Sequence, residues 1–540
     1  MIMVINRNHI KVNIMKNKIK NRLITFSLFM IVTTTIIGCA GYNEDVLDEL
    51  NVERVFSPID LTANVRNRSS VELSWTLAKD IDYYVVEFSP DDESFSNPSK
   101  VLNVSASELP ITVPLIGETL YSIRVKGVSS IGLEDSKWSV VQAQTLSEQI
   151  FLPVVNGDIS ANSALLRWTP NSEVTKLVLT PGDIEHIITP AEKTAGIATI
   201  SGLSSEMNYT ATIYNNTKKR GELNFTTLVD VSNGVLLQPT DDLSAKIAAA
   251  ASGTIFYLAP GDYKLNSGEI ALAKSLTIRG QLPYDKPLLH VKFKLNAGVS
   301  NFSLVDLELS GYDASGAIQA DSYLINLGSV GATYNDILIS GCKIHDFQRS
   351  LIYASVASAK VNSFTLDNSI VSKTNTTAGA DFIDFRTTFV KDIVLKNSTF
   401  DTCSASRDFV RADAGTFTGT GLNTSVLIDK CTFYNTSNIA SGNRRILYVR
   451  FNSNNSTVSN CIFSTTTALH SNQSATSIPV FLNNYYFEAA AFKDATIASN
   501  KVDANGVVAD PQFLSPATGD FTVGNGALID SKAGDPRWIK

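Results

Sequence analysis

The residues DILISGCKIHDF at 336–347 decide the fold, because versions of this phrase return through the second half of the chain. The related stretches are FTLDNSIVSKT at 364–374, DIVLKNSTFDT at 392–402, VLIDKCTFYNT at 426–436 and STVSNCIFSTT at 456–466. When the stretches are superposed, one position is occupied by a small residue in each: Cys342, Ser369, Ser398, Cys431 and Cys461. Leu307 occupies the same position one repeat earlier in the chain. This position recurs every 27 to 35 residues. Such a period, carried by short alternating strands with Asn, Asp and Gly corners, predicts the stacked coils of a parallel β-solenoid.

A second repeated segment lies between these stretches. DFIDFR at 381–386, DFVRAD at 408–413 and RILYVR at 445–450 superpose when Ile383, Val410 and Leu447 are aligned. Because side chains alternate along a strand, those residues and Phe385, Ala412 and Val449 are predicted to face inward. The other positions are predicted to form a charged, solvent-facing grid on three successive coils: Asp384, Arg411, Tyr448, Arg386, Asp413 and Arg450.

The N-terminus has the pattern of an export signal. From Met15, which we expect to be the true start, a basic stretch is followed by an apolar run at 23–37 and a small residue before Cys39. Residues 1–38 therefore resemble a bacterial lipoprotein signal peptide, which implies lipidation of Cys39 and a membrane anchor. An uncleaved anchor is the alternative, but the run is shorter than the ~20 residues that span a bilayer. The acidic linker at 39–54 is similar to the signal that sends lipoproteins to the outer face of Gram-negative cells, and a solvated linker explains it nearly as well.

Composition narrows the class of protein and its partners. The chain has 540 residues, 44% of them hydrophobic and 18% charged, and a formal net charge of −7. An acidic chain of this kind is globular, long enough for several domains and a poor partner for nucleic acid. No CxxC pair occurs among its five cysteines. The thiols other than Cys39 are predicted to be structural.

Two β-rich segments precede the solenoid. Residues 55–146 contain VELSW at 71–75, YYVVEF at 83–88 and YSIRVKGV at 121–128, and residues 148–230 contain ALLRW at 164–168 and YTATIY at 209–214. In each segment a leucine lies six residues before a tyrosine, Leu115 before Tyr121 and Leu203 before Tyr209. This spacing suits a tyrosine corner, in which the phenol hydrogen-bonds to nearby backbone. The segments resemble tandem fibronectin type III domains, which act as spacers more often than as binding platforms.

The solenoid, predicted over 234–538, resembles a known superfamily. DDLSAKIAAAASG at 241–253 predicts an Asp- or Ser-capped helix ended by glycine, which plugs the open end of the core. It is followed by PGDY at 260–263 and SLTIRG at 275–280, and the chain ends with DPQFL and GDFTVGNGALID within 510–530, similar to a terminal coil. This arrangement resembles the right-handed parallel β-helices of the pectate-lyase-like superfamily. The expected fold is all-β: two sandwich domains and a single-stranded right-handed parallel β-helix. Lipoproteins of this layout occur in Gram-negative glycan-utilisation systems.

The resemblance implies β-elimination on uronic-acid polysaccharides. A cation, Ca²⁺ in this reading, neutralises the substrate carboxylate, and a basic side chain removes the proton at C5. The charged grid supplies these residue types. Arg411, Arg386 and Arg450 are the candidate catalytic residues, and Asp384 and Asp413 are the candidate metal ligands. The candidate substrate-binding residues, suited to carboxylate capture or sugar stacking, are Arg407, Arg444, Arg445 and Tyr448.

Other interpretations remain open. Alternating signs at these positions are also typical of a salt-bridge ladder without a ligand, and no catalytic motif of the superfamily matches residue by residue. His345 and Asp346 are a capping arrangement more readily than a catalytic pair, and Phe451, Tyr485 and Tyr486 are core residues more readily than sugar platforms. We therefore expect a monomeric, lipid-anchored protein of the outer membrane, exposed at the cell surface, that contacts acidic polysaccharide. It is either a Ca²⁺-assisted lyase, or a non-catalytic glycan-binding protein or structural adhesin.

Overall fold

The computed structural model describes residues 53–377 and 379–540. The predicted signal peptide, the lipidation site Cys39 and most of the acidic linker lie outside the described residues. Within the described ranges, no helix is long and apolar enough to cross a membrane.

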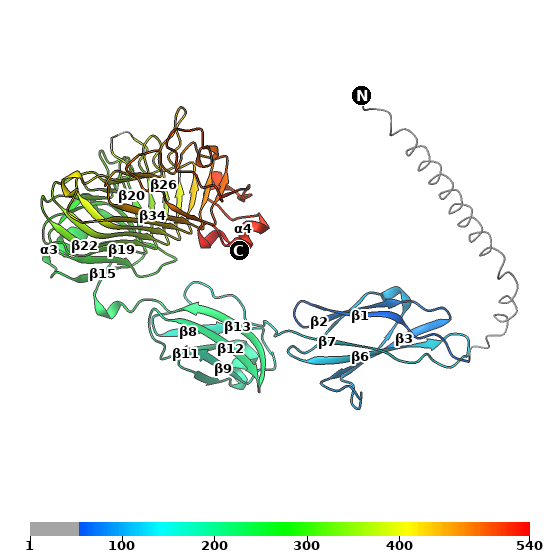
Figure 1. Cartoon of the computed structure of the whole chain (residues 1–540). Coiled ribbons are helices and arrows are strands. Elements are labelled where there is room, and N and C mark those ends of the chain that lie inside the picture. The colour runs from blue at the N-terminus through cyan, green and yellow to red at the C-terminus, as the bar shows by residue number, and fades with distance from the viewer. Residues whose placement is uncertain (1–52, 378) are drawn as a thin grey trace, which may run out of the picture. The chain divides into compact units, whose positions relative to one another are not determined.

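The first module, which carries the labels β1, β2, β3, β6 and β7 in Figure 1, consists of two antiparallel sheets. One has the order β1 (Ile59–Arg66), β2 (Ser70–Thr76), β5 (Ile111–Pro114), and the other β4 (Lys100–Val104), β3 (Ile81–Pro90), β6 (Leu120–Ser129), β7 (Ser139–Gln144). Trp75 and Tyr84 meet edge to face in the core, with ring centroids 5.2 Å apart. The phenol oxygen of Tyr121 accepts a hydrogen bond from the Ile116 amide at 3.2 Å, so the predicted tyrosine corner is confirmed.

The next segment repeats these features. Its four-stranded sheet has the order β10 (Ile184–Ile187), β9 (Lys176–Thr180), β12 (Asn208–Asn215), β13 (Lys218–Thr226), and β11 (Ile197–Ser201) pairs with β8 (Ser163–Arg167). A short helix, α2 (Pro190–Ala195), is capped by Thr189. The Tyr209 phenol oxygen accepts a hydrogen bond from the Ser204 amide at 2.9 Å, which confirms the second tyrosine corner.

One helix, α3 (Leu243–Ala249), lies near the start of the solenoid and is shorter than the predicted helix. Asp242 caps it by accepting a hydrogen bond from the Ala245 amide at 3.0 Å. The helix ends at Ala250 and not at glycine, because Ala250 already has an extended backbone. Leu243 and Ile247 are buried in the same core as the coils, so α3 covers the open end of the core as predicted.

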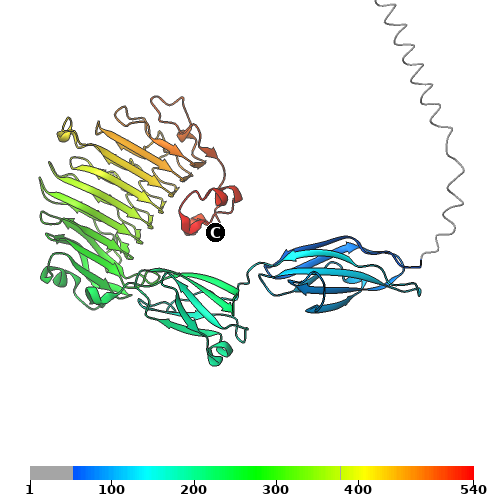
Figure 2. The ribbon, with the colours of Figure 1, turned by 60° about the horizontal axis from the view of Figure 1, so that its bottom comes forward.

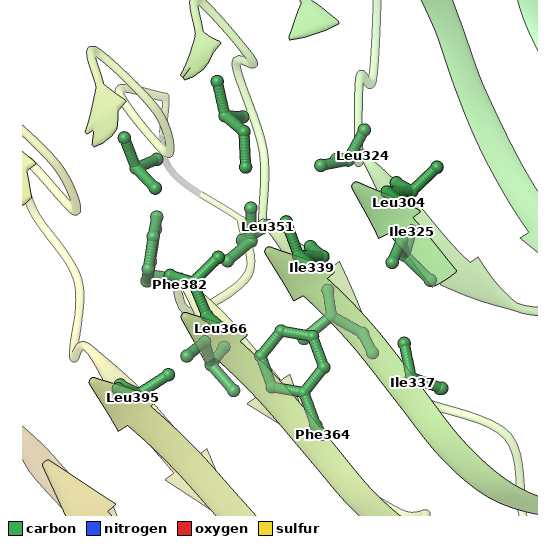
Figure 3. Close-up of a cluster of buried hydrophobic side chains, with 14 of the residues drawn as sticks. Leu304, Leu324, Ile325, Ile337, Ile339, Leu351, Phe364, Leu366, Phe382 and Leu395 are labelled. Carbon is green, nitrogen blue, oxygen red and sulfur yellow. The ribbon is translucent and has the colours of Figure 1, made fainter. Parts of the chain in front are cut away.

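Ten parallel strands form one sheet of the solenoid, and Figure 2 shows them stacked in chain order from green to orange. They are β14 (Val235–Leu237), β15 (Thr254–Leu258), β17 (Leu276–Gly280), β19 (Phe302–Val305), β22 (Thr333–Ser340), β25 (Lys360–Asp367), β28 (Phe389–Lys396), β31 (Thr424–Asp429), β34 (Asn454–Ser459) and β36 (Val480–Leu482). Leu304, Ile339, Leu366 and Leu395 align across four of these strands and are fully buried (Figure 3). The sheet therefore contributes regular columns of apolar side chains to the core.

Two further parallel ladders branch from the long strand β18 (Leu288–Leu295), which also pairs with β16 (Asp262–Leu272). One ladder comprises β20 (Glu308–Ser310), β23 (Lys343–His345), β26 (Ile370–Ser372), β29 (Thr399–Asp401), β32 (Thr432–Tyr434), β35 (Ile462–Ser464), β37 (Tyr485–Phe487) and β38 (Val507–Val508). The other comprises β21 (Ile325–Leu327), β24 (Ile352–Tyr353), β27 (Ile383–Phe385), β30 (Val410–Ala412) and β33 (Leu447–Val449). The coils from β21 to β35 thus each add one strand to each of three walls, and the predicted parallel β-helix is confirmed.

The repeated small-residue column lies at a corner inside the coils. Cys342, Ser369, Ser398, Cys431 and Cys461 are all buried, and none of the described cysteines forms a disulfide. The residue before each of them has a positive φ: Gly341, Asn368, Asn397, Lys430 and Asn460. The left-handed conformation turns the chain between two walls, which explains the frequent Asn and Gly at this position. The thiols are therefore structural, as predicted.

The C-terminal segment differs from the predicted terminal coil. After β38 the described chain adds no further strand, and residues 509–539 pack against the ladder that contains β32, β35 and β37. Val523 and Leu528, the latter in α4 (Gly526–Ser531), contact Ile462 and Tyr485. Asp535 then accepts a hydrogen bond from the Thr399 hydroxyl at 2.7 Å. The segment therefore covers apolar residues on the outside of that ladder.

Candidate functional site

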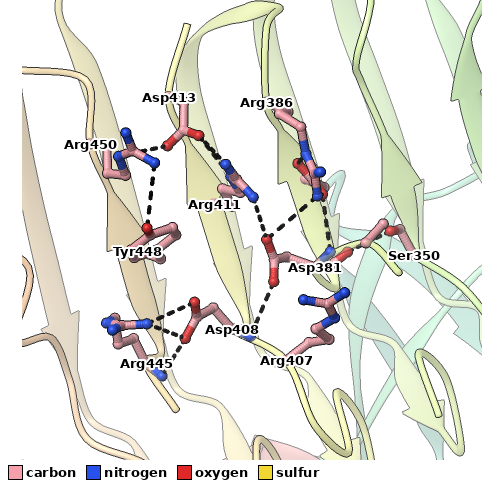
Figure 4. A network of polar contacts seen from close by, with 12 residues as sticks. Ser350, Asp381, Arg386, Arg407, Asp408, Arg411, Asp413, Arg445, Tyr448 and Arg450 are labelled. Atoms are coloured by element: carbon pink, nitrogen blue, oxygen red, sulfur yellow. Dashed lines mark hydrogen bonds and ion pairs between the residues drawn. The ribbon is translucent and has the colours of Figure 1, made fainter. Parts of the chain in front are cut away.

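The repeated hexapeptides form the ladder of β27, β30 and β33. Asp384 pairs with Arg411 in register, and Arg411 with Tyr448. The flanking residues Ile383, Val410, Leu447, Phe385, Ala412 and Val449 are all buried, so the predicted inward positions are confirmed. The ladder brings together every candidate site residue of the solenoid predicted above. Figure 4 shows the polar contacts among most of these residues, together with Arg407.

Asp384 is the innermost charge of the network. Its side chain is completely buried, whereas the alternation of the strand predicted a solvent-facing position. The Arg386 guanidinium donates to it from Nη2 at 2.6 Å, and the Asp381 amide donates at 3.0 Å. The prediction was wrong because Arg386 and the turn before β27 cover a side chain that alternation alone directs outward. Hydrogen bonding to Asp384 raises the pKa of Arg386.

Arg411 joins two coils. Its Nε donates to Asp413 on the same coil at 2.8 Å, and its Nη1 lies 3.3 Å from Asp381 on the previous coil. Burial favours the neutral form of Arg411, yet the Asp413 carboxylate and its neighbours raise the pKa above the ordinary value of arginine. Burial raises the pKa of Asp381, and the nearby carboxylates of Asp384 and Asp408 raise it further. Arg411 is therefore a permanent cation in this arrangement.

Asp408 anchors the next coil. The Arg445 guanidinium contacts both of its carboxylate oxygens, at 3.2 and 3.0 Å, and the Arg445 amide donates at 2.8 Å. The Asp408 amide in turn donates to Asp381 at 3.2 Å. Asp381 and Asp408 are thus central to the network, although we did not single them out from the sequence. The signal was present, because both are the first residue of a repeated hexapeptide, before a buried phenylalanine.

Tyr448 lies among three guanidinium groups. The carbon atoms of these groups are 4.7 Å (Arg445), 5.5 Å (Arg411) and 5.7 Å (Arg450) from the centroid of its ring. Such contacts between cations and an aromatic ring are attractive. Arg450 is half exposed, and its Nη1 is 3.4 Å from the Tyr448 hydroxyl. Tyr448 is therefore in contact with several cationic side chains at the surface. By contrast, Phe451, Tyr485 and Tyr486 are buried, as the core interpretation predicted.

Arg407 and Arg444 differ from the other arginines of the ladder. They occupy equivalent positions, each three residues before the aligned residues Val410 and Leu447 of successive coils. Neither guanidinium has an ion-pair or hydrogen-bond partner among the residues that the structure describes, and the Nε of each is buried without an acceptor. Because neighbouring coils are ~4.8 Å apart, the backbones at these two positions belong to adjacent levels of the solenoid. A buried donor without a partner is costly, which makes this position suitable for an anionic ligand.

The predicted metal ligands do not fit Ca²⁺. Calcium requires six to eight oxygen ligands, and both Asp384 oxygens already face protein donors. Asp413 has one carboxylate oxygen, Oδ1, without a hydrogen bond, but Arg450 and Arg411 flank this side chain. Within 53–377 and 379–540, no three His, Cys, Asp or Glu side chains are arranged to hold a metal ion.

His345 and Asp346 lie on the other ladder, at the end of β23. His345 Nδ1 is 2.7 Å from Asp346 and its Nε2 is 3.2 Å from Glu308. Burial opposes protonation of His345, but the two carboxylates outweigh it and raise the pKa of the imidazole. Glu308, which accepts from His345 and Lys343, has a pKa lowered to about 2. These contacts make a local charge cluster that is separate from the network of β27, β30 and β33.

Comparisons with known proteins give resemblances for parts of the chain and establish no function. Two family models, each described only as a domain of unknown function, match residues 261–403 (DUF4957) and 426–538 (DUF5123). No curated protein sequence matches the chain. Among solved structures, a two-domain fibronectin type III segment of chicken tenascin is 19% identical (TM-score 0.23) and covers 31% of this chain and 97% of its own. An alginate lyase of the PL6 family is 15% identical (TM-score 0.34), over 63% of this chain and 47% of its own.

Proposed function

We propose that the β-helix binds an acidic polysaccharide at the arginine cluster of β30 and β33, and that it acts as a glycan-binding protein without cleaving the chain. The observation that carries this proposal is the pair Arg407 and Arg444. Both are cations without a carboxylate partner among the described residues, and each has a buried, unpaired Nε. Both side chains are only partly buried, so a carboxylate or sulphate group at the surface would accept hydrogen bonds from the accessible part of each guanidinium. Guanidinium groups suit such oxyanions because their donors lie in one plane.

The surrounding charge supports an anionic ligand. The cluster consists of six arginines and four aspartates, so it is net positive in a chain that is acidic overall. The arginines are Arg386, Arg407, Arg411, Arg444, Arg445 and Arg450, and the aspartates are Asp381, Asp384, Asp408 and Asp413. The acids are mostly buried behind the arginines, with exposed side-chain fractions of 0% for Asp384, 5% for Asp381 and 8% for Asp408. A ligand at the surface therefore meets guanidinium groups first.

The same geometry favours binding over β-elimination. A lyase needs a basic side chain that is neutral and free to accept a proton. Arg411 is paired with Asp413 and Asp381, which raise its pKa, and Arg386 is paired with buried Asp384. Glycoside hydrolysis needs two accessible carboxyl groups, and Asp381, Asp384 and Asp408 are buried in ion pairs. We therefore assign the arginines to ligand capture.

The proposal includes the location of the protein. A lipid on Cys39 would attach the chain to the outer membrane, and the two fibronectin-like segments would separate the solenoid from the lipid. At the cell surface this arrangement would hold an extracellular polysaccharide close to the membrane.

Calorimetric titration of the purified protein tests the proposal. Polygalacturonate, alginate, chondroitin sulphate and heparin are the ligands, with neutral dextran as the control polymer. We expect an acidic polymer to bind and the double variant R407Q/R444Q to weaken it by roughly tenfold or more, because a charged hydrogen bond contributes ~1.5–3 kcal/mol. The matched control is Lys264→Gln, which removes an exposed cation on β16 and should leave affinity unchanged. Unchanged affinity of R407Q/R444Q would contradict the proposal, and unsaturated product, with or without Ca²⁺, would show a lyase instead.

A further inference from the structure

A groove lies beside the arginine pair. It has a volume of about 410 Å³, and its lining comes from the loops that follow β29, β32 and β35 on three successive coils. The residues that matter here are Thr402, Asn435, Asn438, Ile439, Ala440 and Thr467. A volume of this order is within the ~300–1,000 Å³ usual for small-ligand sites. None of the lining side chains is charged, unlike those of the neighbouring ladder.

Amide and hydroxyl groups are arrayed along the groove. Asn435 Nδ2 donates to the Thr402 hydroxyl at 3.3 Å, and Asn438 Nδ2 donates to the Asn435 Oδ1 at 2.8 Å. The amide and hydroxyl of Thr467 both donate to Asn438 Oδ1 at 3.1 Å. An asparagine side chain has two donor hydrogens and two acceptor lone pairs. Asn438 uses all four, because its Nδ2 also donates to the Thr465 carbonyl at 3.4 Å, whereas Asn435 keeps one donor hydrogen and one lone pair for a ligand. Ile439 and Ala440 add apolar surface, which suits the C–H face of a sugar.

The groove and the unpaired arginines belong to the same two loops. The loop after β29 continues from Ala405 to Arg407, and the loop after β32 continues from Ala440 to Arg444. Asn443, next to Arg444, donates from Nδ2 to the carbonyl oxygen of Thr467 at 2.7 Å. This hydrogen bond fixes the arginine loop to the wall of the groove. Because the same two loops carry the arginines and the groove, one extended ligand can contact both.

We infer that the ligand is a heteropolysaccharide in which an uncharged sugar is joined to an acidic one. The inference rests on the proposed function, because Arg407 and Arg444 hold the acidic sugar. The groove takes the uncharged neighbour, through hydrogen bonds to Asn435, which Asn438 holds in place, and through contact with Ile439. A polymer of acidic sugars alone would place a carboxylate in the groove. There the carboxylate would lose hydration and gain no cation from the lining.

Two polymers, compared at equal uronate concentration, test this inference on the full chain. Hyaluronan alternates glucuronate with N-acetylglucosamine, and polygalacturonate contains acidic sugars only. Ala440→Trp fills the groove from an exposed position, and R407Q/R444Q removes the two cations. We expect Ala440→Trp to weaken hyaluronan binding by roughly tenfold, the equivalent of one or two lost hydrogen bonds, and to leave polygalacturonate binding unchanged. R407Q/R444Q should weaken both.

The outcomes distinguish failure of this inference from failure of the proposed function. Tighter binding of polygalacturonate than of hyaluronan by the unaltered chain overturns the inference and leaves the proposed function standing. The inference is also overturned if Ala440→Trp weakens the binding of both polymers, or if it weakens the binding of neither. Asn435→Asp is a second check, because a carboxylate in the groove should weaken hyaluronan binding without filling space. If R407Q/R444Q binds both polymers as tightly as the unaltered chain does, the proposed function is contradicted, and the inference that rests on it is contradicted too.

Discussion

Replacement of Arg386 by methionine tests whether the buried network holds its coils together. Asp384 has no exposed surface and accepts hydrogen bonds from Arg386 Nη2 at 2.6 Å and from the Asp381 amide at 3.0 Å. Methionine retains the aliphatic length of arginine and leaves the carboxylate with the amide alone. Removing one partner of a buried ion pair costs ~3–5 kcal/mol. We expect about 3 kcal/mol, the lower end of that range, because Arg386 is 31% exposed and water can approach in its place.

Hydrogen exchange followed by mass spectrometry is the assay, because a solenoid opens coil by coil and not in one global step. A loss of about 3 kcal/mol corresponds to roughly 100-fold faster exchange, at 1.4 kcal/mol for each factor of ten. The increase should be confined to peptides that contain β27 and β30. The control variant is Arg450→Met. Its Nε lies 3.8 Å from Asp413 and its side chain is 48% exposed, so exchange should change only a few-fold, as for a surface pair worth less than about 1 kcal/mol.

A double variant sharpens the result. Asp384→Asn with Arg386→Met removes the buried charge and keeps a side chain that can accept the Asp381 amide. It should restore most of the protection lost in Arg386→Met. Equal exchange in the Arg386→Met and Arg450→Met variants would refute the reasoning. So would a double variant that is less protected than Arg386→Met.

Three further predictions concern other parts of the chain. Burial raises the pKa of Asp535 to about 6 although Arg537 opposes it, so attachment of the C-terminal segment should be strongest below pH 4 and weaken as pH rises through 6. Limited proteolysis and Trp538 fluorescence would show this dependence, and Asp535→Asn should abolish it. Phe433→Ala removes a ring that is stacked between Phe400 and Phe463 of the neighbouring coils. In urea unfolding, this variant should be destabilised by ~3–5 kcal/mol around β32 and β35. A loss below about 1 kcal/mol would show that these stacked rings are not tightly packed. Tyr121→Phe deletes the 3.2 Å hydrogen bond and should lower the stability of the first module by ~1 kcal/mol in calorimetry, whereas no change would mean that water replaces the phenol.

The solenoid was predictable because its signals are local and repeated. The corner residues before Cys342 and Ser369 need a left-handed backbone, and the sequence marks them with Gly341 and Asn368. Strand alternation correctly directed Val410 and its equivalents inward. The tyrosine corners were predictable for the same reason, since Tyr121 accepts its hydrogen bond from a residue only five positions away. The C-terminal segment was misassigned because its partners, such as Thr399, lie more than a hundred residues earlier in the chain.

The charged site was predictable only in part. Register alone brought Asp384, Arg411 and Tyr448 together, because each strand pairs with the equivalent strand of the next coil. Alternation gives the direction of a side chain but not what covers it, so it could not predict that Asp384 is buried. Nor could it predict the partners: Arg386 pairs with Asp384 two positions away on its own strand, and Arg445 pairs with Asp408 on the previous coil.

The sequence by itself therefore determined a parallel β-helix after two sandwich-like segments, and a ladder of arginines and aspartates on successive coils. Periodicity is sufficient for this, because each coil repeats the same local geometry. Only the tertiary structure decided which charged side chains form ion pairs with one another and which are left without a partner. Arg407 and Arg444 are left without partners because the nearby carboxylates of Asp381 and Asp408 are already occupied by Arg411 and Arg445. That selection depends on distances between side chains of different coils, which no single repeat contains.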